Sequence, residues 1–299
     1  MASDVPFIRS ILHTTDFSQA SNRAFAHALA IALLRQTELT ILHVSDNDGD
    51  DVPWSEFPEV RKTLERWSLL EPNSPRSAVA DRFSVAVSKV AARGTRPVGA
   101  TLRFLEGRPH DLVVLATEGN GQDSSDWLFS SSAEGIRRGS GAMTLFVPAR
   151  SEREMVSFET GDLNVKHILV PVDPNIDAGP AIEFARRSAD VMGDGDVVIT
   201  LLHVGDRLPR MPDAEQNPRW TFRTELRNGD VPAAILAAAA EHRSDLIVMT
   251  TNGRDTLGQA VVDQTADRDH QRERQNRRQA PGQHGAAPYD QSPDTDHQA

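Results

Sequence analysis

Two aspartates directly follow apolar stretches of the sequence, at positions where a carboxylate can contact a ligand. Asp16 ends the stretch that begins at Ile11, and Asp173 ends the stretch that begins at Ile168. Both stretches are typical of buried strands, and a helix-like segment follows each of them. Because aspartate is also a common helix N-cap and turn residue, the pattern leaves ligand contact and capping open for both side chains.

A glycine and a run of serines provide groups that can bind an anion. Gly119 lies shortly after an apolar stretch, and Ser130, Ser131 and Ser132 stand at the start of a helix-like segment. Glycine lets backbone N–H groups approach a phosphate, and a helix N-terminus adds partial positive charge. The serines are also suited to capping that helix, so anion contact and capping both stay open.

Two histidines occupy matching positions in two Leu-His-Val strings. These are His43 and His203. Imidazole is a common metal ligand and proton carrier, but the sequence places no cluster of partner ligands beside either histidine. We therefore interpret both residues as polar strand ends and predict no metal site.

The motifs of several enzyme classes are missing from the sequence. It contains no Gly-x4-Gly-Lys-(Ser/Thr) loop, no His-Glu-x2-His motif and no Gly-x-Ser-x-Gly elbow. The absence of these motifs argues against P-loop, zincin and serine-hydrolase chemistry. The chain also has no cysteine, which excludes disulfides, thiol nucleophiles and zinc ribbons. We predict that the protein is not an enzyme, with weak ATPase activity left open.

The amino-acid composition limits which classes of partner and which cellular compartment we expect. The 299 residues include 43 acidic and 32 basic side chains, for a net charge of −11. Phosphate recognition in nucleic acids needs a concentrated basic surface, so we expect no nucleic-acid partner. The N-terminus lacks the layout of a secretory signal, and no apolar run approaches the roughly 18 residues of a membrane span. We expect a cytoplasmic protein without a membrane partner.

The elements that must position these residues occur twice along the chain. Each half contains apolar strand-like stretches separated by helix-like segments, which is typical of a parallel sheet covered on both faces. The matching pairs are Ile11–Asp16 with Ile168–Asp173, Ser18–Arg35 with Ala178–Met192, Leu39–Val44 with Thr200–Val204, Val98–Leu105 with Ala233–Ala240, and Asp111–Thr117 with Asp245–Thr251. We therefore predict an α/β protein with two doubly wound parallel-sheet domains in tandem.

The predicted domains are residues 1–150 and 166–265, joined by a linker at 151–165. The first half ends with a helix at Ser131–Arg138 and a strand at Met143–Pro148, but their counterparts are missing from the second. After Val262 the chain holds no Val, Ile, Leu, Phe, Met or Trp. Such a segment cannot bury enough apolar surface to offset the entropy of ordering, so residues 266–299 are predicted to be a disordered tail. A frameshift origin and a natural tail both remain open.

The duplicated landmarks resemble the universal stress protein family in its tandem two-domain form. The residues that carry the resemblance are Ile11–Asp16 with Phe17-Ser18, the two Leu-His-Val strings, Gly94 with Pro97, Gly229 with Pro232, and the two Asp-Leu-(Val/Ile)-Val strands. The resemblance covers about residues 7–150 and 165–265. It implies a five-stranded parallel, Rossmann-like sheet in each domain, of the adenine nucleotide alpha hydrolase-like type. Open α/β sheets bind ligands where the strand order reverses, which agrees with the site of the family.

The resemblance also implies residues that bind ATP, with Mg, in the first half. The family's carboxylate after the first strand approaches the adenosine portion, and this position corresponds to Asp16. Val44 would lend backbone groups near the base, and Gly119, Ser130 and Ser131 correspond to parts of the loop that wraps the phosphates. Ala116 stands where the loop has its first glycine, and one extra residue intervenes before Ser130.

The second half departs further from the nucleotide-binding pattern. The counterparts of the first-half residues are Asp173, Val204 and Gly253, while Thr250 replaces the first glycine of the loop. The pair Asp263-Gln264 occupies the terminal Gly-Ser positions, and a carboxylate there repels phosphate unless a metal intervenes. We predict that the second site does not bind ATP.

Three functions remain in competition. The first is a stress-response binding or regulatory module, with an adenine nucleotide in the first domain. The second is a ligand-free protein-interaction scaffold in which both nucleotide sites are lost, and the third is an ATP-hydrolysing enzyme. The family's last strand often mediates pairing between domains, so self-association or pairing of the two domains within one chain is expected.

Overall fold

The computed structural model describes residues 8–45, 53–117, 131–149, 153–209, 217–250 and 259–262. All of them belong to one compact unit, residues 1–266, which contains both halves of the repeat. The predicted tail, residues 266–299, lies outside the described residues, so its predicted disorder stays a prediction.

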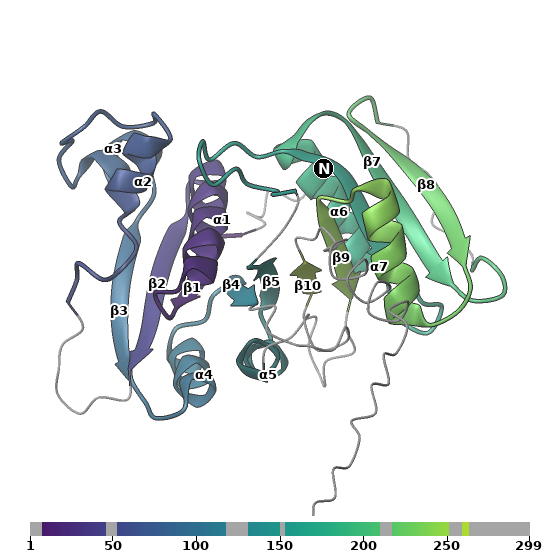
Figure 1. The fold of residues 1–299 in the computed structure, drawn as a ribbon, viewed down its shortest axis with the longest axis horizontal. Coiled ribbons are helices and arrows are strands. Elements are labelled where there is room, and N and C mark those ends of the chain that lie inside the picture. The colour runs from purple at the N-terminus through teal and green to yellow at the C-terminus, as the bar shows by residue number, and fades with distance from the viewer. Residues whose placement is uncertain are drawn as a thin grey trace, which may run out of the picture. The chain divides into compact units, whose positions relative to one another are not determined.

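The first half alternates strands and helices in the predicted order. Its elements are β1 (Ser10–Thr15), α1 (Gln19–Arg35), β2 (Glu38–Ser45), α2 (Val60–Arg66), α3 (Ala78–Phe83), β3 (Val87–Arg93), α4 (Pro97–Gly107), β4 (Leu112–Thr117), α5 (Ser131–Ser140) and β5 (Met143–Pro148). The structure adds α3, and it delimits β3 as an edge strand (Figure 1).

The second half repeats most of this order. Its elements are β6 (Val165–Pro171), α6 (Gly179–Met192), β7 (Gly193–Val204), β8 (Trp220–Arg227), α7 (Val231–His242), β9 (Leu246–Thr250) and β10 (Gln259–Val262). None of the helices described in either half is long and apolar enough to cross a membrane.

The strands form a sheet in the order β3-β2-β1-β4-β5-β10-β9-β6-β7-β8. In the first half β2 and β4 both pair with β1 in parallel, and in the second half β7 and β9 both pair with β6 in parallel. The strand order therefore reverses at β1 in the first half and at β6 in the second half, which is the doubly wound arrangement that the sequence predicts.

The second half ends differently from the first. The first half has a fifth parallel strand, β5, beside β4, whereas β9 pairs on that side with the short strand β10, in antiparallel orientation. Among the described residues, the second half thus has no counterpart of α5 or β5, as predicted. The sequence did not anticipate β10, which also pairs with β5 in parallel and so lies between the two halves.

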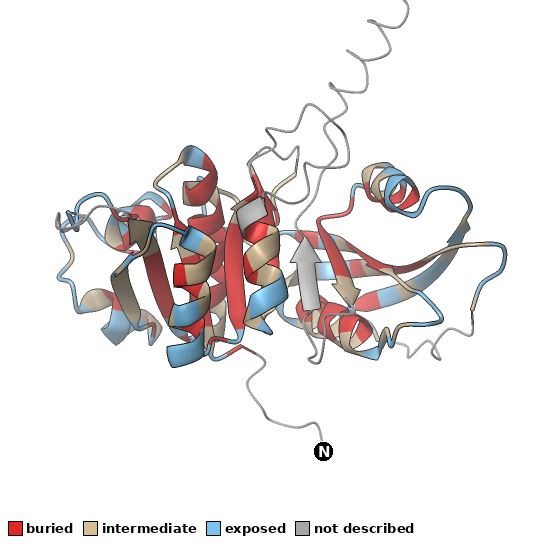
Figure 2. Cartoon of the chain, turned by 90° about the horizontal axis from the view of Figure 1, so that it is seen from below, coloured by how far each residue is buried: buried red, intermediate tan, exposed pale blue. Residues whose placement is uncertain are grey.

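Helices cover both faces of the sheet. Because successive strand residues point to opposite faces, Ile11 packs in the core under α1 and α6, while its neighbour Leu12 packs in the core on the side of α4, α5 and α7. Small residues such as Ala28 in α1 and Ala185 in α6 are fully buried and let these helices lie close to the strands. Figure 2 shows buried strands between helices whose outer faces are exposed.

The predicted helix boundaries agree with the local chemistry. Ser18 caps α1, because its Oγ accepts a hydrogen bond from the backbone N–H of Ser21 over 3.1 Å. In the second half, α6 ends at Met192 with Gly193 as its C-cap residue. The N-cap and the glycine end are both local signals, which explains why the sequence could predict them.

The segment predicted as a linker packs against both halves. Met155 and Val156 are buried, and Val156 forms an isolated bridge with Leu163. Glu154 pairs with Arg23 of α1, and Arg153 pairs with Asp245, just before β9, over 2.8 Å. The described part of this segment therefore contributes to the core beneath α1 and α6.

Candidate functional site

The carboxyl ends of β1, β2 and β4 form the edge where the first-half site is predicted. The register pairs Thr15 of β1 with His43 of β2, so the next residues, Asp16 and Val44, both lie at this edge. β2 and β4 lie on opposite sides of β1, so the strand order reverses at β1. Open α/β sheets bind ligands at such a point. Asp16 is exposed there, as the site requires.

A tight turn fixes the Asp16 side chain between β1 and α1. Its Oδ1 accepts a hydrogen bond from the backbone N–H of Ser18 over 3.0 Å. Phe17, between them, has a φ of 65°, which is an uncommon left-handed conformation for a bulky residue. The Oγ1 of Thr15 accepts from the backbone N–H of Phe17 over 3.1 Å and helps to hold this conformation. Strained residues of this kind cluster at ligand sites, although strain alone assigns no ligand.

Asp16 is ionised at neutral pH. Partial burial raises the pKa of its carboxyl group, but hydrogen bonds from Ser18 and Ser21 outweigh burial and hold the pKa below its ordinary value. An ionised carboxylate only accepts hydrogen bonds, so it suits a ligand that presents hydroxyl groups, such as a ribose. In the described part of the chain, no group of three or more His, Asp or Glu side chains is arranged to hold a metal ion.

Phe17, His43 and Phe57 form an aromatic cluster that packs against the turn. The ring of Phe17 stacks on the imidazole of His43, with centroids 4.1 Å apart, and Phe57 meets Phe17 edge-on at 5.5 Å. The Nδ1 of His43 lies 2.8 Å from the backbone carbonyl of Thr15, and because a carbonyl only accepts, Nδ1 is the donor. His43 therefore acts as a structural donor at a strand end, as the sequence interpretation has it.

Sequence reasoning missed the two phenylalanines of this cluster. Phe17 belongs to the string that carries the family resemblance, but nothing in the sequence signals its positive φ. Phe57 comes from the segment between β2 and α2, and its burial to 1% exposure depends on contacts distant in sequence. An aromatic residue directly after a strand-end carboxylate is the only available signal.

Val44 lies where its backbone can contact a ligand at the strand ends. It is half-buried, and the turn between β3 and α4 passes beside it. A Cβ on Gly94 in that turn would lie 2.8 Å from the Cβ of Ala100 and 3.7 Å from the Cγ1 of Val44. Glycine is thus needed for the close approach of this turn to the end of β2.

The predicted phosphate-loop residues lie mostly outside the described residues. Gly119 and Ser130 belong to the range 118–130, which the structure does not describe. Ser131 is the first residue of α5, although its side chain is not described. In the second half, Gly253 also lies outside the described residues. The phosphate-binding role of all four residues therefore stays a prediction.

The second half presents its aspartate differently. Asp173 is exposed after β6, and its Oδ1 accepts hydrogen bonds from the backbone N–H and the Nδ2 of Asn175, over 2.7 and 3.0 Å. The next helix begins only at Gly179, and its N-cap residue, Ala178, makes no side-chain cap. The carboxylate of the second half thus has a side-chain partner of its own and lacks an adjacent helix N-terminus.

Val204 resembles its first-half counterpart, Val44, more closely than Asp173 resembles Asp16. Val204 is half-buried at the end of β7, and the Nδ1 of the preceding His203 donates to the backbone carbonyl of Val172 over 2.9 Å. This is the hydrogen bond that His43 makes to Thr15. Pro174 follows Asp173 where Phe17 follows Asp16, so no aromatic ring from that position covers the histidine.

Comparisons with known proteins agree with the sequence resemblance. A sequence model described as "Universal stress protein family" matches residues 8–148 and 213–268, more than half of the chain. A search of curated proteins found no match.

Among the solved structures that match, two that cover most of this chain show the same fold at low identity. A universal stress protein from Archaeoglobus fulgidus is 16% identical, with 88% of this chain and 98% of that chain covered and a TM-score of 0.51. A functionally unknown protein from Pseudomonas aeruginosa is 14% identical, with 91% and 98% covered and a TM-score of 0.52. A universal stress protein in complex with cAMP is 19% identical, with 48% and 99% covered and a TM-score of 0.32.

Proposed function

Because the chain belongs to the universal stress protein family, we propose that it is a cytoplasmic stress-response protein that binds an adenine nucleotide, ATP, in its first half. The absence of cysteine fits a reducing compartment. The role is binding and regulation, without a catalytic step of its own.

The placement of Asp16 carries this proposal. Its ionised, exposed carboxylate stands at the point where the strand order reverses, directly before the N-terminus of α1. There it can accept hydrogen bonds from ribose hydroxyls, while the backbone of Val44, on the neighbouring strand, contacts the base. The aromatic cluster and the Ser18 cap hold the turn in place before a ligand binds, which lowers the entropy cost of binding.

In this proposal the phosphates are bound by residues that follow β4 in the sequence. Gly119, Ser130 and Ser131 are the proposed contacts, and support comes from the start of α5 at Ser131, since a helix N-terminus attracts anions. Mg²⁺ bound together with the phosphates would neutralise part of their charge.

The second half is proposed to have lost ATP binding. No helix begins directly after Asp173, because α6 starts only at Gly179, and Asp263 stands where the phosphate loop of the family ends. Val204 and Gly253 keep their positions in the sequence, but without a phosphate cradle they hold no nucleotide. One nucleotide per chain is therefore expected.

A ligand-free interaction scaffold is the second candidate. It is favoured by the side chains at the first-glycine positions of both loops, Ala116 at the end of β4 and Thr250 at the end of β9. The Oγ1 of Thr250 is buried without a hydrogen-bond partner among the described residues. In this case the pairing of β10 with β5 and β9 would be the functional feature. ATP hydrolysis ranks third.

Calorimetric titration of the full chain with ATP and Mg²⁺, and with cAMP, tests the proposal. Wild type and Asp173→Ala should bind one nucleotide per chain with equal affinity, whereas Asp16→Ala should bind at least ~10-fold more weakly, because it loses charge-assisted hydrogen bonds. Equal binding by Asp16→Ala would place the nucleotide elsewhere. No binding by the wild type would favour the scaffold.

A further inference from the structure

Strand β8 ends the sheet and has one unpaired backbone edge. It stands last in the strand order and pairs in parallel with β7, and no described strand lies on its other side (Figure 1). The carbonyls of Arg219 and Arg227 accept hydrogen bonds from backbone N–H groups on the side of β7. Because successive strand residues turn their backbone groups to opposite sides, the even-numbered residues of β8 direct theirs outward. These residues are Phe222, Thr224 and Leu226.

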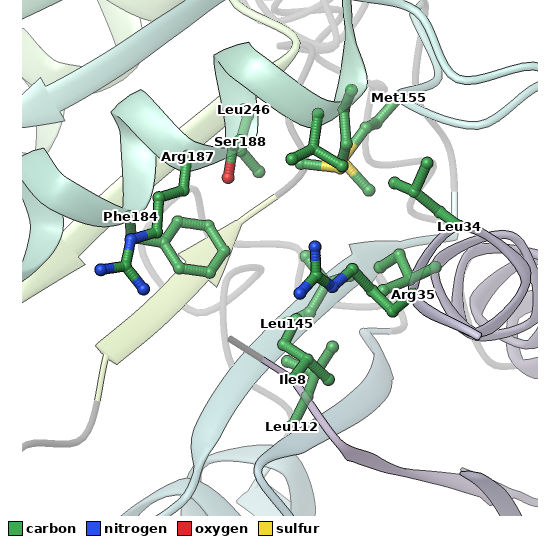
Figure 3. A pocket seen from close by; sticks show the side chains of 13 residues that line it. Ile8, Leu34, Arg35, Leu112, Leu145, Met155, Phe184, Arg187, Ser188 and Leu246 are labelled. Atoms are coloured by element: carbon green, nitrogen blue, oxygen red, sulfur yellow. The ribbon is translucent and has the colours of Figure 1, made fainter. Parts of the chain in front are cut away.

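Packing against α6 holds this edge in a fixed shape. Trp220 is buried, and its Nε1 donates to the Oδ1 of Asp190 in α6 over 2.9 Å. The ring of Phe222 meets Trp220 edge-on at 5.1 Å. On its other side, α6 faces α1 across a small apolar pocket that Phe184 and Met155 line (Figure 3). The backbone of β8 is therefore preorganised, and a strand that pairs with it meets a lower entropy cost.

The charged side chains of β8 share the face of the sheet that α7 covers. Glu225 pairs with Arg227 on the same strand and with His242 of α7. A carboxylate has about four acceptor sites, so Glu225 can accept a further hydrogen bond. Arg223 is exposed and has no ion-pair partner among the described residues. The edge thus presents an unpaired cation and, two residues later, a carboxylate with acceptor sites to spare.

This pattern is complementary to itself in one antiparallel register, with a two-fold axis through Thr224. Arg223 of each copy then lies opposite Glu225 of the other, and Phe222 lies opposite Leu226. Thr224 lies opposite its own copy, and the outward N–H and C=O groups of the two threonines form a hydrogen-bonded pair. Arg223 and Glu225 belong to a non-hydrogen-bonded pair, in which opposite side chains lie closest. The register therefore satisfies the backbone and the charges together.

Other edges and other registers lack this match. The last strand of the first half, β5, is already paired on both sides, with β4 and β10, which leaves β3 and β8 as the edges of the described sheet. Strand β3 carries Lys89 and Arg93 without an acidic residue, so two copies of it repel. In β8, an axis through Arg223 or through Glu225 sets like charges directly opposite each other, which is destabilising. An axis nearer either end of the strand pairs fewer residues.

We propose that two copies of this chain associate through β8, so that one sheet continues across a two-fold axis at Thr224. The outward backbone groups supply the ladder of hydrogen bonds, and Arg223 and Glu225 form an ion pair on each side of the axis. Leu226, which is 39% exposed, becomes covered by Phe222 of the other copy. The occupant of this edge is a second copy because both sides of the match come from the same strand. The proposal does not rest on nucleotide binding, since none of these residues belongs to that site.

Sedimentation velocity of the full chain over a range of concentrations tests the charge match. The wild type should be dimeric at ~100 μM protein, which requires a dissociation constant below that concentration. Arg223→Glu sets two carboxylates opposite each other, and Glu225→Arg sets two guanidinium groups opposite each other. Each variant alone should therefore dimerise at least ~10-fold more weakly than the wild type. Arg93→Glu is the matched control, because it reverses an exposed charge on β3, and it should dimerise like the wild type.

A mixture of the two charge variants tests the register itself. When Arg223→Glu is mixed with an equal amount of Glu225→Arg, position 223 of each chain faces an opposite charge at position 225 of the other. The mixture should therefore form dimers that neither variant forms alone at the same concentration. Thr224→Pro tests the backbone, because it removes an outward N–H and leaves the hydrogen bonds to β7 in place, so it should abolish the dimer. Ala91→Pro, at an outward position of β3, is its control and should not change dimerisation.

Three outcomes would overturn the proposal. They are a wild type that stays monomeric at ~100 μM, a mixture that associates no better than its two components, and a Thr224→Pro variant that dimerises like the wild type. If Glu225→Arg does not fold, as judged by circular dichroism, Arg223→Glu and Thr224→Pro are compared with their two controls on β3. Equal dimerisation of all four variants would then overturn the proposal as well.

Discussion

His43 donates a hydrogen bond from its Nδ1 to the backbone carbonyl of Thr15 over 2.8 Å, and so ties the end of β2 to the turn that carries Asp16. The same ring stacks on Phe17, the residue with the strained backbone. In the second half His203 makes the equivalent hydrogen bond to Val172, over 2.9 Å, without a stacked phenylalanine from the turn. The first-half turn is thus held by a hydrogen bond and a stacked ring, whereas the second-half turn has only the hydrogen bond from the histidine.

Replacement of His43 by alanine should release this turn. The variant loses one hydrogen bond to the backbone and the stacked contact, so the free energy of unfolding should fall by about 1–3 kcal/mol. ATP affinity should fall as well, because Asp16 is then held less firmly. Urea unfolding and calorimetric titration measure the two effects.

The matched control is His203→Ala. It removes the same hydrogen bond in the second half, and it should reduce stability without changing ATP affinity. A loss of ATP affinity of the same size in both variants would show that His43 acts through global stability rather than through the turn.

Two further aspartates support the starts of the strands rather than a ligand. The Oδ2 of Asp111 accepts hydrogen bonds from the backbone N–H groups of Arg9 and Ser10, and the Oδ2 of Asp245 accepts from those of Lys166 and His167. Each aspartate thereby fixes the beginning of the first strand in its own half. Asp245 is 1% exposed and also pairs with Arg153 over 2.8 Å, whereas Asp111 is exposed.

Because of this difference in burial, the same substitution should have unequal effects. Asp245→Ala removes a buried acceptor from two part-buried N–H donors and from Arg153, so it should lower the free energy of unfolding by roughly 2–4 kcal/mol. Asp111→Ala exposes its donors to water and should lower it by about 1 kcal/mol. Urea unfolding at neutral pH compares them, and equal losses would contradict a role for burial.

The fold follows largely from local signals in the sequence. The apolar runs of β1, β4, β6 and β9 predict central strands, and Ser18 and Gly193 mark helix ends. The edge strands β3 and β8 gave weaker signals because their residues are mostly half-buried or exposed. The four residues of β10 are too few to predict a strand, and their pairing depends on β5 and β9 from elsewhere in the chain.

The sites follow from the sequence only in part. Asp16 could be identified because it directly follows a strand, but the positive φ of Phe17 and the contact of Phe57 result from tertiary packing. Arg35 lies in the last turn of α1, where a positive charge interacts favourably with the helix dipole, but the sequence does not show that its Nε is buried without a hydrogen-bond partner.

The buried histidines should make the protein sensitive to acid. Burial lowers the pKa of His13 to about 4, although the carbonyl of Val114 and the charge of Asp16 oppose the shift. Burial likewise lowers the pKa of His167 to about 4, with His242 adding to the effect. In the unfolded chain a histidine has a pKa of about 6.5, so the unfolded state binds more protons as the pH falls below that value.

Because of this difference in proton binding, acid should destabilise the folded state. Stability is fully present above about pH 6.5 and is lost as the pH falls from 6.5 to about 4, by roughly 2 kcal/mol at pH 5 for each histidine. Urea unfolding at pH 7.5 and pH 5 should show this loss, and His13→Gln should show a smaller loss than the wild type. An unchanged pH dependence in His13→Gln would mean that His13 is not the group that titrates.

Docking of the segment between the halves depends on Gly161. Its φ is +75°, and a Cβ there would lie 2.4 Å from the Cδ2 of Trp67, whose Nε1 donates to the backbone carbonyl of Phe158 over 3.0 Å. Gly161→Ala should therefore cost at least ~1 kcal/mol of stability, because both the backbone and the indole must shift. Gly195→Ala is the control, since its φ is +93° but no atom lies within 4 Å of a Cβ there. Limited proteolysis should cut the segment at 153–164 faster in Gly161→Ala than in Gly195→Ala, and equal rates would contradict a docked segment.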